Sequence, residues 1–376
     1  ADGRLYVVGG HSVGTRGIPS TVLYDASTGG WTVTGPMAQG RYYPTTTVLA
    51  NGEVLAISGT DELQNHVTIP EVGNGTTWRQ LTTASLDIGN PYYPAMFLAP
   101  NGKVFLAGFP QTTRYLDVSG TGTWTTVGDR VVADRKMGSA VMYAPGKILY
   151  VGGGDPPTNT AEIIDLNAPT PAWTFTGSMA YARRHLNATL LPTGEVLVTG
   201  GTSIGPNDPA GAVHVAELWN PTTGTWTTLA SNAVIRMYHS TTLLMPDGRA
   251  LHTGSGDGAN AVHEKNYELY SPPYLFQGAR PSISGATPAQ VAYGQIVFVA
   301  TPDATSITKV SFIRFSSVTH AFDMGARFVP LSFSQAGGGL SVAMPAGGTI
   351  APPGPYMLFL VNGNGVPSEA RIMRLS

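Results

Sequence analysis

The feature that most constrains this chain is a repeat with a period of about 50 residues. Each repeat opens with a turn glycine, continues with a short apolar strand pattern such as VLAIS, and carries a second glycine after that strand. The turn glycines are separated by 49, 50, 44, 48 and 54 residues, and they are Gly3, Gly52, Gly102, Gly146, Gly194 and Gly248. A fixed period of this length predicts one compact unit per repeat, stacked against its neighbours.

Each repeat also carries the patterns of three further strands. A second strand such as VLYDAST or AELWNPT follows in most repeats, and a strand such as HSTTLLM precedes the turn glycine. Another strand is opened by a tryptophan, at spacings of 47, 46, 49 and 53 residues: Trp31, Trp78, Trp124, Trp173 and Trp226. Four short antiparallel strands per repeat predict the blades of a kelch-type β-propeller, seven-bladed when complete. We expect the tryptophans to pack between blades.

The repeat pattern ends near Pro272. The segment PPYLFQGARPSI has the character of a linker, and new alternating strands follow, among them GQIVFVA, ITKVSFIRF and YMLFLVN. About 95 residues of such strands predict an immunoglobulin-like β-sandwich. The expected organisation is all-β, with a propeller over residues 1–275, its N-terminal strands missing, and a sandwich over residues 276–376.

Composition excludes several classes of function. Charged residues make up 12% of the chain and the net charge is −2, so nucleic acid and anionic membrane surfaces are not expected partners. The chain has no cysteine, which excludes cysteine-based zinc or redox motifs within it. No apolar run is long enough for a membrane span. A secreted, extracellular or cell-surface protein is expected.

One position recurs in the repeat with unusual chemistry. Nine residues before the turn glycines from Gly52 onward stand Tyr43, Tyr93, Met137, His185 and His239. Equivalent repeat positions occupy equivalent places in space, so these side chains should crowd one mouth of the central channel. They either plug that channel or form a site, and the repeat alone leaves both possibilities open.

Three separated motifs carry a family resemblance. They are RMYHS at residues 236–240, SSVTH at residues 316–320 and RYYPTT at residues 41–46, each with similar flanking sequence. In these motifs, and in the ending at residues 355–368, the chain resembles the copper-radical oxidases related to galactose oxidase and glyoxal oxidase. The resemblance covers nearly the whole chain.

The resemblance implies one copper ion held by His239, His320 and Tyr43, with Tyr238 as axial ligand. It also implies that Tyr238 is the general base and that Tyr43 is the redox partner of the metal. The expected reaction oxidises a primary alcohol, an aldehyde or a sugar end with O2 and yields H2O2. Imidazole and phenolate ligands suit Cu(II). Adjacent Tyr238 and His239 can reach one metal only if the strand is irregular there.

The chain departs from this family at two points. The family's radical tyrosine is linked to a cysteine, and the matching repeat position lies seven residues before Ala1. A Tyr–Cys cofactor is therefore possible only with a cysteine outside this chain. That cysteine could lie on a separate N-terminal fragment that completes the propeller, on a segment lost by truncation, or nowhere if the chemistry was abandoned. The second departure is Asp61, which stands where galactose oxidase has a tryptophan. Tyr93, His185 and Asp61 are the candidates for the substrate mouth.

Two alternatives to an oxidase remain open at the level of sequence. One is a non-catalytic kelch propeller that binds glycan or protein. The other is a redox-inactive copper protein that uses the same ligands without a radical. The remaining histidines, His11, His66, His214, His252 and His263, have no metal-ligand spacing and are expected to be surface or packing residues.

Overall fold

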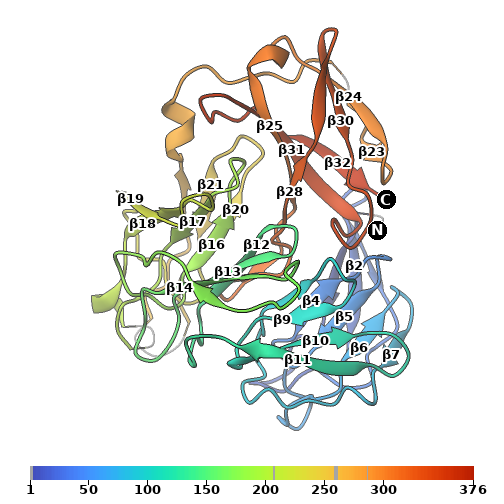
Figure 1. The fold of residues 1–376 in the computed structure, drawn as a ribbon. Coiled ribbons are helices and arrows are strands. Elements are labelled where there is room, and N and C mark those ends of the chain that lie inside the picture. Colours follow the sequence, from blue (N-terminus) through green and yellow to red (C-terminus); the bar gives the residue numbers. More distant parts are fainter. Residues whose placement is uncertain (1–2, 206–207, 258–260, 286) are drawn as a thin grey trace.

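The computed structural model describes residues 3–205, 208–257, 261–285 and 287–376, and its regular structure is almost entirely β (Figure 1). Six small antiparallel sheets follow one another along the chain, and a second domain packs on them. The helical segments among the described residues are three short 3-10 helices: η1 (Pro209–Gly211), η2 (Pro273–Phe276) and η3 (Ala304–Ser306). None of the described helices has the length and apolarity that a membrane span requires.

Each of the six sheets corresponds to one sequence repeat, with its strands in chain order. The first three sheets contain β1 (Leu5–Val8), β2 (Thr21–Asp25) and β3 (Gly30–Val33); β4 (Thr45–Val48), β5 (Val54–Ile57), β6 (Glu71–Gly73) and β7 (Trp78–Gln80); and β8 (Met96–Leu98), β9 (Val104–Leu106), β10 (Thr112–Asp117) and β11 (Thr123–Asp129). The last three contain β12 (Ser139–Ala144), β13 (Lys147–Val151), β14 (Ala161–Asp165) and β15 (Thr174–Phe175); β16 (Asn187–Leu190), β17 (Val196–Thr199), β18 (Val215–Trp219) and β19 (Trp226–Ser231); and β20 (Thr241–Leu244), β21 (Ala250–Thr253) and β22 (Tyr267–Tyr270).

These sheets are propeller blades, as the repeat predicted. The turn glycines all have a left-handed backbone, for example Gly52 at φ 87° and Gly194 at φ 90°, which explains why the turn recurs as glycine. Inner strands of successive blades contact one another, as in the pairs β4–β8, β12–β16 and β16–β20. Two of the six sheets have three strands among the described residues. In this part of the chain, the first blade lacks an innermost strand next to β1, and the last blade lacks an outermost strand next to β22.

Four of the five repeat tryptophans pack between blades, as expected. Trp78 stacks on Tyr6 of the preceding blade with ring centroids 5.7 Å apart. The indole nitrogens of the other three donate to the preceding blade, to Ala84 O, Thr113 Oγ1 and Gly177 O, from Trp124, Trp173 and Trp226 respectively. Trp31 differs, because it packs on Tyr24 of its own sheet and is 61% exposed.

The second domain is a β-sandwich. One sheet has the order β23-β32-β31-β25-β28 and the other the order β24-β30-β29. Its strands are β23 (Gln290–Val291), β24 (Ile296–Ala300), β25 (Ile307–Arg314), β28 (Phe328–Leu331), β29 (Phe333–Ala336), β30 (Gly339–Ala343), β31 (Gly354–Asn362) and β32 (Arg371–Leu375). Inward-facing residues of both sheets, including Val299, Phe312 and Leu358, form one buried core.

A hairpin of the second domain enters the propeller. It consists of β26 (Val318–Thr319) and β27 (Phe322–Asp323), which contact the inner strands β12, β16 and β20. Phe322 lies edge-on to Phe97 of β8 at 5.7 Å, within a core that also contains Met142 of β12. The buried Arg327 donates from Nη2 to Leu98 O of the third blade. The hairpin is therefore anchored on both sides of the residues at its turn, His320 and Ala321.

Candidate functional site

The recurring position nine residues before each turn glycine has one backbone conformation in all five repeats. Tyr43, Tyr93, Met137, His185 and His239 all have a left-handed φ, between 47° and 64°. Non-glycine residues rarely adopt this region. Each residue lies two or three positions before its inner strand begins, rather than on that strand. The conformation lets these side chains leave the blade edge at one mouth of the channel.

Backbone hydrogen bonds connect these positions from blade to blade. Tyr93 N–H donates to Tyr43 C=O at 3.1 Å, and His185 N–H donates to Met137 C=O at 2.7 Å. The unusual conformation is therefore held by the neighbouring blade and not by local sequence alone.

His320 is the centre of an aromatic cluster at this mouth. Its ring centroid lies 4.3 Å from that of Tyr43, 4.4 Å from that of His239 and 5.4 Å from that of Tyr238. Tyr93 stacks on its other side at 4.5 Å. The structure thus brings together the four side chains that the sequence proposed as copper ligands, from two blades and the second domain.

Tyr238 and His239 both enter this cluster although they are neighbours in sequence. Their rings stack with centroids 3.8 Å apart. They precede β20, and the left-handed backbone of His239 (φ 64°) breaks the alternation that would send them to opposite faces. Tyr43 Oη lies 3.4 Å from His239 Nε2, so the two residues are in hydrogen-bond contact without a metal.

The donor atoms of the cluster fit a metal ion. His320 Nδ1 contacts Thr319 Oγ1 at 2.6 Å, whereas its Nε2 is buried and has no hydrogen-bond partner among the described residues. A buried imidazole nitrogen without a hydrogen-bond partner lowers the stability of the fold unless a ligand binds it. Within the described residues, no three His, Cys, Asp or Glu side chains gather as a metal site. Two imidazoles here would need phenolic oxygens to complete a ligand set, which is a combination that suits Cu(II).

Burial sets the protonation of these groups. It lowers the pKa of His320 to about 3, with a smaller contribution from His239, and it also lowers the pKa of His239. Both imidazoles are therefore neutral at pH 7, the form that binds metals. Burial raises the pKa of Tyr43 to about 12 and also raises that of Tyr238. A metal bound by these phenols must displace their protons.

The three residues expected at the substrate mouth differ in position. His185 is buried and lies edge-on to Tyr238 at 5.0 Å, and burial lowers its pKa to about 3. Tyr93 lies beside Tyr43 and His320. Asp61 has no contact with the cluster among the described residues, and its Oδ1 accepts the N–H groups of Leu63 and Asn65 in its own loop. This geometry gives Asp61 a structural role in that loop.

Sequence reasoning missed two further tyrosines. Tyr42 stacks on Tyr43 at 3.8 Å, and Tyr92 lies edge-on to Tyr43 at 5.6 Å. The signal was available, because a Tyr-Tyr-Pro triplet occupies the same repeat position in two successive blades. Asp257 was also missed; its Oδ2 lies 3.9 Å from His239 Nδ1.

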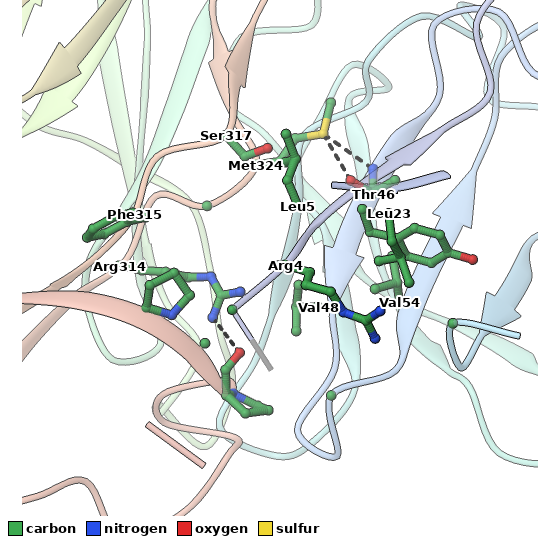
Figure 2. Close-up of a pocket in the computed structure, with 18 of the residues that line it drawn as sticks. Arg4, Leu5, Leu23, Thr46, Val48, Val54, Arg314, Phe315, Ser317 and Met324 are labelled. Carbon is green, nitrogen blue, oxygen red and sulfur yellow. Dashed lines mark hydrogen bonds between the residues drawn. The ribbon is translucent and has the colours of Figure 1, made fainter. Parts of the chain in front are cut away.

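A groove follows the free edge of β1 and ends at the cluster. Its upper part, about 540 Å³, is lined by residues 5–11, by Tyr43 and Tyr93, and by Thr241 of the last blade. Its lower part, about 300 Å³, runs between the first blades and the second domain (Figure 2). Leu5, Thr46 and Met324 line both parts, and Thr46 donates from its backbone N–H and its hydroxyl to Met324 Sδ, each at 3.4 Å.

Comparisons with known proteins agree with this architecture. Residues 280–375 match the family model described as "Galactose oxidase-like, Early set domain". The whole chain is 31% identical to a galactose oxidase of Gibberella zeae and spans 59% of its length. It is 28% identical to the aldehyde oxidase GLOX of Vitis pseudoreticulata, over 89% of this chain and 72% of that protein.

A solved structure is similar along the whole chain. It is described as a novel fungal alcohol oxidase of the AA5 family in complex with copper, and it is 29% identical to this chain with a TM-score of 0.91. The match covers 100% of this chain and 84% of that one.

Proposed function

This chain is homologous to galactose oxidase and to the glyoxal oxidase-type aldehyde oxidases, and we propose that it forms most of a copper oxidase. The proposed reaction converts a primary alcohol, or the hydrate of an aldehyde, to the next oxidation state while O2 is reduced to H2O2. Two electrons and two protons pass from substrate to O2, so the reaction balances without an organic cofactor. The observation that carries the proposal is the convergence of Tyr43, Tyr238 and His239 on the buried, unpartnered Nε2 of His320.

We propose that His239, His320, Tyr43 and Tyr238 would hold the copper. Neutral imidazoles and an unpartnered nitrogen support the two histidines. The contact between Tyr43 Oη and His239 Nε2 supports a shared partner for those two atoms. When bound, copper would polarise a substrate oxygen and accept one electron.

Residues of the chain would carry out proton transfer, one-electron transfer and orientation of the substrate. Tyr238 Oη would take the proton of the substrate hydroxyl, because burial raises the pKa of Tyr238 and its phenolate would be a strong base. Tyr43 is the one-electron redox partner, and its ring is in contact with the stacked ring of Tyr42 and the edge-on ring of Tyr92. Tyr93 and His185, on either side of the cluster, orient the substrate.

The Tyr–Cys form of the redox cofactor requires a thiol that this chain lacks. We propose that it is supplied by an extended segment outside the chain that pairs with the free edge of β1. Leu5 and Val7 of this edge strand are 51% and 38% exposed, and proteins normally cover an edge strand that exposes apolar side chains. The groove along the edge ends beside Tyr43, which supports delivery of a side chain to that ring.

The test uses the full-length polypeptide loaded with copper. We expect H2O2 release with primary alcohols or aldehydes, and a peptide containing Tyr43 joined to a cysteine peptide with the loss of two hydrogens. His320→Ala should abolish both copper binding and H2O2 release, whereas His66→Ala should change neither, because His66 is exposed and paired with Asp87.

The other outcomes separate the alternatives. Copper binding with an unmodified Tyr43 and without H2O2 would identify a redox-inactive copper protein. Failure to bind copper at all would leave a glycan- or protein-binding propeller.

A further inference from the structure

A second cavity lies on the same face of the propeller as the aromatic cluster. It has a volume of about 740 Å³ and lies between the third and fourth blades. Three loops form it: the segment before β8, the β9–β10 loop and the segment before β12. Successive strands of a blade are antiparallel, so the start of β8, the end of β9 and the start of β10 all lie at one face. That face also carries Tyr93 and Met137, which stand just before β8 and β12.

The cavity combines flat apolar surfaces with polar side chains. Phe109, Pro91 and Pro110 provide the apolar surfaces, and Tyr92 contributes a ring with a hydroxyl. The polar side chains carry donors and acceptors of both charge types and are Asn90, Gln111, Asp134 and Lys136. The volume falls within the roughly 300–1,000 Å³ typical of sites for small ligands.

Tyr92 separates this cavity from the cluster. Its ring lines the cavity and lies edge-on to Tyr43 at 5.6 Å. A substrate that reacts beside Tyr43 can therefore continue into the cavity without crossing another blade.

Several polar side chains of the cavity are already held in place. Gln111 Nε2 donates to Arg130 C=O at 2.9 Å, and Asn90 Oδ1 accepts the N–H of Tyr92 at 3.1 Å. Asp134 Oδ1 accepts the N–H of Lys136 at 2.9 Å. Side chains fixed before binding lose less entropy when a ligand arrives.

We propose that this cavity binds the glycosyl unit next to the oxidised end of an oligosaccharide. The C–H face of a pyranose packs on Phe109 or Tyr92, and its hydroxyl groups bond the amides, the carboxylate and the ammonium around them. A pyranose uses both the apolar surfaces and the hydrogen-bonding side chains around them, whereas an alkyl chain would use the apolar surfaces alone. The inference rests on the proposed oxidase function for the position of the reacting end, but binding in the cavity can be measured without turnover.

The test measures binding and turnover separately, on the full-length, copper-loaded protein. Calorimetry in O2-free buffer compares raffinose, cellotriose and maltotriose with their terminal monosaccharides. We expect at least one trisaccharide to bind about tenfold more tightly than its monosaccharide. Phe109→Ala should remove that difference, and Lys136→Ala, at an exposed position, should reduce it about threefold. Leu63→Ala is the matched control, because Leu63 is 74% exposed on a loop of the second blade and does not line this cavity.

In turnover, Phe109→Ala should lower the ratio of kcat/KM for the trisaccharide to that for the monosaccharide about tenfold. The proposal is overturned if no trisaccharide binds more tightly than its monosaccharide, or if Phe109→Ala and Leu63→Ala behave alike. It is also overturned if 1-hexanol shows the same dependence on Phe109, since that would assign the cavity to alkyl chains. Trisaccharide binding that depends on Phe109 in a protein that releases no H2O2 supports the cavity and refutes only the oxidase.

Discussion

At the scale of single residues, the proposed site depends on backbone conformations that its side chains do not favour. Five residues of different chemistry adopt the left-handed region at the same place in five blades, and His320 joins them at φ 49°. A left-handed backbone at a non-glycine residue reduces the free energy of unfolding by on the order of 1 kcal/mol. It persists only where the surrounding structure fixes that conformation. Hydrogen bonds between blades contribute at four of the five positions, by joining Tyr93 to Tyr43 and His185 to Met137. The result is a set of rings that meet at one point instead of alternating across strands.

Copper binding should release protons at neutral pH, because burial raises the pKa of Tyr43 to about 12 and keeps its phenol protonated without metal. A ligand that must lose one proton makes the apparent affinity rise about tenfold per pH unit. We expect Tyr43→Phe to release about one proton fewer and to lower that slope by one. Calorimetry in buffers of different ionisation enthalpy counts the protons, and Tyr181→Phe, partly exposed on the fourth blade, is the control. Equal proton release in wild type and Tyr43→Phe would exclude Tyr43 as a phenolate ligand.

His252 should make the protein sensitive to acid. It is 2% exposed, its Nε2 has no partner among the described residues, and burial lowers its pKa to about 3, with a smaller contribution from Arg236. Below pH 6.5 the unfolded chain binds a proton at this residue and the folded chain does not. Stability is therefore full above pH 6.5 and falls as the pH drops toward 3, by about 1.4 kcal/mol per pH unit.

His252→Leu removes this sensitivity and places an apolar side chain where the third blade has Leu106. We expect the variant to be at least as stable as wild type at pH 7.5, and more stable by about 2 kcal/mol at pH 5. Urea denaturation at the two pH values measures the difference. A constant difference between variant and wild type would show that His252 titrates normally in the fold.

At the scale of elements, a buried ion pair recurs inside the blades. Four blades pair an arginine that precedes the inner strand with a glutamate on the third strand, and the pairs are Arg41–Glu71, Arg135–Glu162, Arg183–Glu217 and Arg236–Glu268. In each of the four, the arginine also donates to a backbone carbonyl of its own blade. The pair thus connects the segment before the inner strand to the outer half of the sheet. In the second and fifth blades, the arginine of the pair stands two residues before Tyr43 or His185.

Glu217→Ala should destabilise the fold strongly, because it leaves the fully buried Arg183 without a counter-charge. It also removes the acceptor of the Ala180 N–H. Breaking a buried pair in this way costs about 3–5 kcal/mol. Lys147→Ala, which breaks the half-exposed pair with Asp165, should cost less than about 1 kcal/mol. Urea denaturation of both variants provides the comparison, and similar losses would contradict a special role for the buried pairs.

The blades could be predicted from sequence because their determinants are local. A turn glycine indicates a left-handed backbone, and the apolar strand that follows each turn glycine is short in every blade, with three to five residues. The ion pairs were not predicted, although Arg41, Arg135 and Arg183 each stand two residues before the recurring position that lies nine residues ahead of a turn glycine. Their glutamate partners follow at 27 to 34 residues, a spacing too variable to recognise in one sequence. Trp31 was predicted to pack between blades and instead is exposed, because its burial would need a neighbouring blade that the described chain does not provide.

The candidate site also has residues that could be predicted from the sequence and residues that could not. The repeat alone places four residues together, because equivalent positions of a repeat occupy equivalent places in the propeller. They are Tyr43, Tyr93, His185 and His239. His320 could not be placed in this way, since its position depends on how the hairpin of the second domain enters the propeller; only the family resemblance indicated it. Asp61 was expected at the substrate mouth because it stands where galactose oxidase has a tryptophan. In the structure its carboxylate instead accepts hydrogen bonds within its own loop.

At the scale of the whole molecule, the proposed copper site joins two domains that each have their own core. The sandwich has a core cluster of its own, whereas another cluster combines blade residues with Ile313, Phe328 and Phe359 of the sandwich, and the hairpin carrying His320 contacts the inner strands of the blades. Arg327 and Phe322 already anchor this hairpin to the third blade. A metal bound by His320 from one domain and by His239 and Tyr43 from the other would add a further connection that exists only when both domains are folded.

Copper should therefore raise the melting temperature of the protein as a whole. At a free concentration 100 times the Kd, binding to the native state alone contributes about 2.7 kcal/mol, which corresponds to a shift of several degrees in Tm. His320→Ala should remove the shift, and it should also lower the Tm of the metal-free protein because it deletes the ring contacts with Tyr43 and Tyr93, so the copper shift is measured within each variant. Calorimetric scans with and without copper measure both quantities, and Mg²⁺ at the same concentration is the control. A copper shift that survives in His320→Ala would mean that the propeller binds the metal by itself, and the hairpin would then be a packing element rather than the source of a ligand.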